Sequence, residues 1–255
     1  MDYYKQIFKR KSFHIFKDTD TLTGDEIQEL KDFIKTVKPL NAEIKTEICI
    51  VPEKETTCKR GGEFCILFYS ETKDEYLRNI GYIGEQIDLY LASQDIGALW
   101  FGIGKPKDMQ LNGLDYVIMI SIAKMPEDKF RKDMFKSKRK PLSEIWNGNT
   151  LGIAEIVRFT PSACNTQPWI VENTDNELMI YREIDEYKLY YIRKRIDSEP
   201  IIVNITKEDY WITIVISLKK IPVYRCLMDI ILVLRSHIPM VKQKQSQTER
   251  PPLLI

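Results

Sequence analysis

The chain has 255 residues, of which 44% are hydrophobic and 29% charged, and its formal net charge is +1. This length provides a substantial core for one large domain or two small ones, and the composition is that of an ordinary globular protein. The nearly neutral balance gives no reason to expect a nucleic acid or a membrane as a partner, and it favours a protein that binds small molecules or soluble partners.

The first half predicts alternating helices and strands. Residues 3–9 form a short helix, and Thr23 with Glu26 forms a capping box that opens an amphipathic helix, which ends at Pro39. We further expect strands over 43–53, 62–70 and 115–124 and a helix over 82–97, with Gly97 as its C-terminal stop.

The second half repeats part of this order. Residues 125–141 are charged and predict an exposed connection, in which Lys136, Lys138, Arg139 and Lys140 form a solvated basic loop. A helix over 150–159, a proline-bearing loop and a hairpin over 169–182 with its turn at 174–176 follow, which makes a weak internal repeat of the first half. The division expected is therefore a first half over 1–124, the connection, a diverged second half over 142–240 with strands beyond residue 183, and a disordered tail over 241–255.

The five cysteines predict no metal site. They are odd in number and form no CxxC pair, and the chain has only two histidines, so we expect buried or incidental thiols in a reducing compartment. A nucleophilic Cys164 is the lesser alternative, because no His or Asp stands near it in sequence to activate it. The N-terminus lacks the apolar region of a signal peptide and no run approaches the roughly 20 apolar residues of a membrane span, so the expected location is cytoplasmic.

The stretch "FKRKSFHIF" at residues 8–16 carries the first candidate site. Arg10, Lys11, Ser12 and His14 place two fixed charges, a hydroxyl and an imidazole within five residues, which suits a phosphate clamp. In an extended segment Ser12 and His14 would point one way, and Phe13 and Ile15 the other. The alternative is a basic surface strand.

The stretch "RFTPSACNTQPWIVE" at residues 158–172 carries the second. Pro161 fixes a turn after the helix, and Ser162 and Asn165 can hydrogen-bond the polar edge of a ring. Ala163 and Cys164 are small enough to let a planar ligand approach the backbone. The alternative is an ordinary polar loop between a helix and a strand.

Together the segments "RKSFHIF" and "PSACNTQPW" resemble the two signatures of the FMN-dependent nitroreductase family. The second matches at Pro161, Ser162, Asn165, Gln167, Pro168 and Trp169, and the first at Arg10, Ser12 and Phe16, with His14 where the family usually has Arg or Lys. Residues 89–108 look like the family's central helix and its glycine-rich turn. The resemblance implies an α+β fold with a mixed or antiparallel sheet flanked by helices.

The spacing of the two signatures differs from the family's pattern. Ordinary members carry both close together in each subunit of a homodimer, whereas about 150 residues separate them here. The resemblance therefore implies a pseudo-dimer fused in one chain, acting as a monomer or a weak homo-oligomer.

By resemblance, the ten candidate residues surround one FMN. Arg10 and Lys11 would grip the phosphate and ribityl chain, Ser12 and His14 would lie at the ribityl or pyrimidine end, Gly102 and Gly104 would let the backbone approach the isoalloxazine ring, and Pro161, Ser162, Ala163 and Asn165 would line its other side.

The activity implied is transfer of a hydride from NAD(P)H to the flavin and then to a nitroaromatic or quinone-like acceptor, with no catalytic side chain required. The alternatives are a non-catalytic protein on the same scaffold, with or without flavin, and an unrelated α+β interaction protein.

Overall fold

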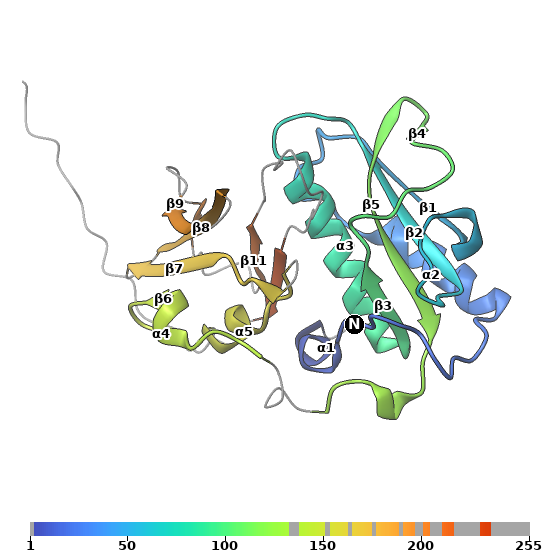
Figure 1. Cartoon of the computed structure of the whole chain (residues 1–255), viewed down its shortest axis with the longest axis horizontal. Coiled ribbons are helices and arrows are strands. Elements are labelled where there is room, and N and C mark those ends of the chain that lie inside the picture. The colour runs from blue at the N-terminus through green and yellow to red at the C-terminus, as the bar shows by residue number, and fades with distance from the viewer. Residues whose placement is uncertain are drawn as a thin grey trace, which may run out of the picture.

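A computed structural model describes residues 3–132, 138–150, 154–162, 165–174, 177–188, 191–196, 201–204, 211–216 and 230–235 (Figure 1). The helices are α1 Tyr3–Lys9, α2 Gly24–Thr36, α3 Tyr76–Ser93, α4 Leu142–Ile145 and α5 Ala154–Phe159, with short 3-10 turns at Glu53–Glu55 and Glu127–Lys129. The strands are β1 Thr46–Pro52, β2 Phe64–Ser70, β3 Ile96–Trp100, β4 Gln110–Leu111, β5 Leu114–Lys124, β6 Trp146–Asn147, β7 Trp169–Thr174, β8 Glu177–Lys188, β9 Tyr191–Ile196, β10 Ile201–Asn204, β11 Trp211–Ile216 and β12 Ile230–Arg235.

The larger sheet has the order β1-β2-β5-β3, with every neighbouring pair antiparallel and β4 paired to β5. Its central strand β2 is buried on both faces, as its continuous run of apolar residues indicates. Helices α2 and α3 cover one face, where Ile66 and Phe68 of the sheet pack with Leu30 of α2 and Ile87 of α3. This layer supports the loops that carry the candidate residues of the first half.

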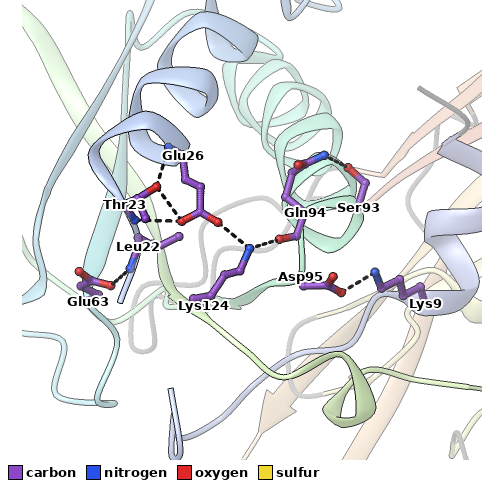
Figure 2. A network of polar contacts seen from close by, with 9 residues as sticks. All are labelled: Lys9, Leu22, Thr23, Glu26, Glu63, Ser93, Gln94, Asp95 and Lys124. Carbon is purple, nitrogen blue, oxygen red and sulfur yellow. Dashed lines mark hydrogen bonds and ion pairs between the residues drawn. The ribbon is translucent and has the colours of Figure 1, made fainter. Parts of the chain in front are cut away.

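The predicted capping box of α2 is confirmed. The Thr23 hydroxyl accepts a hydrogen bond from the Glu26 backbone N–H, and the Glu26 carboxylate accepts one from the Thr23 N–H. Figure 2 shows that the other carboxylate oxygen of Glu26 accepts a hydrogen bond from Lys124 at the end of β5, which also donates to the carbonyl of Gln94 after α3. Lys124 therefore joins the start of α2, the end of α3 and the sheet.

The predicted end of the central helix is wrong. Helix α3 ends at Ser93, and Asp95 makes the turn with a φ of 56°. Gly97 lies instead inside β3, where a Cβ would come within 2.6 Å of Met125 Cγ and 2.9 Å of a ring carbon of Phe13. Glycine is needed there for close packing and not for a helix cap.

Strands β6 to β10 form a second sheet, in which β6 and β7 are parallel and the other pairs are antiparallel. This sheet has the order β10-β8-β7-β6, with β9 also paired to β8, and β11 pairs with β12. The predicted hairpin is confirmed as β7 and β8, and the strand character beyond residue 183 is confirmed by β9, β10 and β11. Ala163, Cys164, Lys136, the turn residues 175 and 176 and the tail 241–255 lie outside the described residues.

The fold is therefore α+β with antiparallel sheets and few helices, as expected, whereas the pseudo-dimer and the division into two halves stay predictions. Within the described residues, no helix has both the length and the apolar character that crossing a membrane requires.

Candidate functional site

The basic segment after α1 runs beside the edge strand β3. Ser12 forms a parallel bridge with Ala98, and the Phe13 N–H donates to the Ala98 carbonyl over 3.0 Å. Phe13 is buried and Ser12 half-buried, but the chain bends at His14, so Ile15 is 57% exposed. The alternation expected for an extended segment therefore holds only as far as His14.

Arg10 lies in a buried ion pair. Its guanidinium Nε is 2.6 Å from Asp88 Oδ2 and 3.8 Å from Glu85 Oε1, both on α3. Asp88 Oδ2 also accepts the Trp100 indole N–H over 2.8 Å. Asp88 thus fixes the basic segment and the end of β3 to the same turn of α3.

Burial favours the protonated form of Glu85 beside this pair. Burial raises its pKa to about 8, against the lowering effect of the Arg10 charge and with a further increase from Asp88. Asp88 is the nearer carboxylate and takes the Arg10 charge, so Glu85 stays uncharged. The sequence carries a signal of this cluster, because two carboxylates spaced three apart on a buried helix require a cationic partner.

The late loop is held in a strained conformation. Asn165 and Gln167 have φ angles of 57° and 49°, in the left-handed region that only glycine enters without cost. Ser162 Oγ accepts the Gln167 N–H over 2.9 Å, and Gln167 Oε1 accepts the Lys140 N–H over 2.7 Å. Strain that the surrounding bonds maintain in this way is common at ligand sites.

Arg139 joins this loop to the connection. Its guanidinium donates to the carbonyls of Phe159 and Thr160 and, over 2.7 Å, to Asn165 Oδ1. The Asn165 amide in turn donates to the Lys138 carbonyl. The prediction of a solvated basic loop is therefore wrong for Arg139 and Lys140, which are half-buried and bonded to the loop after α5.

Positive charge from the basic segment and from the connection before the late loop lies close together. Burial lowers the pKa of Arg139 to about 10, with further lowering by Arg131 and by Arg10. Burial likewise lowers the pKa of Lys11, and Arg131 is again a neighbouring cation. Arg139, which holds the late loop, therefore lies in the field of Arg131 and Arg10, and Lys11 in that of Arg131, so an anion is favoured near these side chains.

The glycine-rich turn lines a cavity of about 870 Å³. Gly102 and Gly104 border it, together with Tyr116 of β5 and the exposed side chains of Ile103 and Met109. A cavity of this size is typical of sites for small molecules and cofactors.

The backbone of Gly104 is already engaged within the protein. Its N–H donates to the Phe101 carbonyl over 3.2 Å, and its carbonyl accepts the Tyr116 hydroxyl over 3.1 Å. A Cβ at Gly104 would lie 2.7 Å from both Met119 Sδ and a ring carbon of Phe101, so the glycine is required by this packing.

Sequence reasoning missed three members of the site. Asp88 and Trp100 position the basic segment, and Arg139 positions the late loop. The sequence placed Arg139 in a charged stretch without apolar periodicity, and nothing in that pattern indicates that its side chain folds back onto residues 159–165.

The chain was compared with known proteins. The family model described as "Putative TM nitroreductase" matches residues 2–212. Among curated proteins no sequence matches significantly.

Solved structures with similar folds include three bacterial proteins. A putative nitroreductase from Thermotoga maritima has 24% identity, covers 71% of this chain and 76% of its own, and gives a TM-score of 0.49. A nitroreductase family protein from Clostridium difficile has 14% identity, coverage of 56% and 96% and a TM-score of 0.44. A putative nitroreductase in complex with FMN from Desulfovibrio desulfuricans has 15% identity, coverage of 56% and 94% and a TM-score of 0.41.

The family match spans most of the sequence, including both signature segments. The chain therefore belongs to this nitroreductase family.

Proposed function

We propose that this protein binds FMN between the basic segment and the late loop, and that it transfers a hydride from NAD(P)H to nitroaromatic or quinone-like acceptors. Membership of the nitroreductase family supports the general class, an oxidoreductase of flavin type. The observation that carries the cofactor assignment is the positive field around Lys11 and Arg139, to which Arg131 contributes at both side chains, because FMN brings a phosphate dianion.

The residues present fit a phosphate-bearing cofactor. Lys11 is half-buried with its Nζ 4.6 Å from the centroid of the Phe13 ring, which leaves its ammonium hydrogens for a phosphate. Arg10 is held by Asp88 through Nε, so the terminal nitrogens of its guanidinium are the atoms assigned to the cofactor. Binding of the phosphate would offset the repulsion from Arg131, which adds to the effect of burial in lowering the pKa of Lys11 and of Arg139.

The rest of the cofactor is assigned to three further parts of the chain. Ser12 and His14 lie on the phosphate and ribityl side, since they follow Lys11 directly. The late loop, with Pro161, Ser162, Ala163 and Asn165, lines the opposite side. The Gly102–Gly104 turn takes the ring end, where the cavity of about 870 Å³ has room for a nicotinamide and then for an acceptor.

Bound FMN would supply the hydride chemistry, and the chain's own residues position it and shield it from water. No side chain is assigned an acid or base role. The exposed apolar residues Ile103 and Met109 at the cavity offer a surface on which a planar acceptor can pack.

The test is titration of the purified full-length protein with FMN, followed through quenching of flavin fluorescence. Lys11→Ala is expected to weaken FMN affinity about ten- to a hundredfold, the value of one charge-assisted hydrogen bond. Lys17→Ala removes an exposed lysine from the same part of the chain and is expected to leave the affinity unchanged.

Turnover separates the proposed enzyme from a non-catalytic relative. NAD(P)H is expected to bleach the bound flavin, and a quinone is expected to restore its colour. FMN uptake without bleaching would identify a non-catalytic flavin protein, and a wild-type chain that takes up no FMN would refute the proposal.

A further inference from the structure

The loop between β1 and β2 gathers three metal-ligating side chains that no part of the proposed flavin site uses. Glu53, Cys58 and Cys65 bring one carboxylate oxygen and two sulfur atoms within 4.8 Å of one another. Their exposures are 9%, 2% and 0%. We propose that these three side chains bind a Zn²⁺ ion.

Strand pairing and not sequence spacing creates this cluster. In the β1–β2 register Val51 pairs with Cys65, so the chain leaving β1 through Glu53 returns beside Cys65. Cys58 lies in the loop between them. The cysteine spacing in the sequence predicts no metal site, because the seven-residue separation of Cys58 and Cys65 is not a CxxC pattern.

The donor set selects zinc. Two thiolates and one carboxylate suit a borderline-soft ion, whereas Mg²⁺ and Ca²⁺ prefer oxygen ligands alone. Zinc bonds of about 2.3 Å to sulfur and about 2.1 Å to oxygen place tetrahedral ligand atoms about 3.5–3.8 Å apart. Binding would require side-chain rotations that bring the three ligand atoms, which now lie within 4.8 Å of one another, to this separation.

The Glu53 carboxylate is oriented by neighbours and keeps room for an ion. Oε1 accepts the Ser121 hydroxyl over 3.0 Å and the Arg60 N–H over 3.3 Å, and Oε2 accepts the Gly61 N–H over 3.2 Å. A carboxylate has about four acceptor positions, so one remains for the metal. Such outer hydrogen bonds fix the orientation of metal ligands in proteins.

Backbone packing and access fit the same assignment. A Cβ at Gly62 would collide with Ser121 Oγ and lie 3.1 Å from Glu53 Oε1, so only glycine allows the chain to pass this close to the cluster. A cavity of about 730 Å³ is lined by Glu53, Thr56 and Cys58. It provides an entry path, and the fourth coordination position would be left to solvent.

The loop that the ion would fix supports both first-half segments of the proposed flavin site. The Phe16 N–H donates to the Arg60 carbonyl over 2.8 Å. Thr57 exchanges two hydrogen bonds with Lys105, next to the Gly102–Gly104 turn. The ion would therefore hold this loop in place, and its binding can be measured without FMN.

The experiment uses the full-length protein, reduced and stripped with EDTA, then titrated with Zn²⁺ or with Co²⁺ as a spectroscopic probe. We expect one ion per chain, thiolate-to-cobalt charge-transfer bands and a higher thermal midpoint with Zn²⁺. Cys58→Ser and Cys65→Ser should each remove the bands. Cys49→Ser changes a half-buried cysteine outside the cluster and should retain them.

Ser121→Ala tests the outer hydrogen bond and should weaken zinc affinity about 10- to 100-fold. If a cysteine variant fails to fold, the cobalt spectrum of the wild type decides alone. The proposal is overturned by wild-type protein that binds no zinc, by equal loss in Cys49→Ser, or by a Cys58–Cys65 disulfide in the isolated protein. None of these outcomes depends on FMN uptake, so the two proposals fail separately.

Discussion

Glu85→Gln tests the buried charge cluster that fixes the basic segment to α3. The variant replaces a carboxyl group that is 4% exposed with a neutral amide of the same shape. Burial raises the pKa of Glu85 from 4.5 to about 8, so the folded protein holds a proton there that the unfolded chain releases. Glutamine holds no such proton, and the two proteins must therefore differ in how their stability depends on pH.

The sign follows from proton linkage. Between pH 4.5 and pH 8 the folded state binds more protons at Glu85 than the unfolded state, so stability falls as the pH rises through this window. A pKa of about 8 in place of 4.5 removes several kcal/mol of unfolding free energy between about pH 5 and pH 8. The contribution is fully present only below the ordinary pKa of a glutamate.

The assay is urea unfolding of wild type and E85Q at several pH values across this window. The two proteins should be equally stable within about 1 kcal/mol near pH 5, and E85Q should be the more stable by several kcal/mol near pH 8. Asp88→Asn is a useful companion, because it leaves Glu85 as the counter-ion of Arg10 and should reduce the pH dependence. Parallel profiles for wild type and E85Q would refute the assignment of a protonated Glu85.

Three further substitutions test packing, capping and the late loop. Gly62→Ala should destabilise the fold by roughly 1–3 kcal/mol in chemical denaturation, because the new Cβ collides with Ser121. Gly24→Ala has open space around it and should stay within about 0.5 kcal/mol of wild type. Equal effects of the two substitutions would contradict the packing argument. Thr23→Ala should cost about 1 kcal/mol by removing the cap of α2, and an unchanged denaturation midpoint would show that the capping box contributes nothing. Arg139→Ala should weaken FMN binding at least about tenfold, because the loop carbonyls lose their charged donor; unchanged FMN titration would separate Arg139 from the cofactor site.

The first half of the fold follows from local sequence patterns. Helix α2 was predictable because Thr23, Glu26 and a regular apolar face act within a few residues. The end of α3 was not, because Asp95 makes the turn and Gly97 serves contacts with Phe13 and Met125 that lie far away in the chain. A glycine in the sequence indicates a turn or a close backbone approach, but the sequence does not tell which of the two requires it.

The candidate site was predictable in its residue types more than in their partners. The two signature segments identify the family, but the sequence does not indicate that Arg10 pairs with Asp88 or that Arg139 returns to the loop at Asn165. The Glu53, Cys58 and Cys65 cluster depends on the register of two strands, which spacing along the chain does not reveal. Contacts of this kind come from tertiary structure alone.

The Trp100 indole, which donates to Asp88, can report on the N-terminal segment through its fluorescence. One carboxylate oxygen receives both the Arg10 guanidinium and the Trp100 indole N–H, so any event that lifts the N-terminal segment off α3 changes the polarity around that indole. Tryptophan emission, with Trp100→Phe as the blank, thus records docking of residues 3–10 without any attached dye.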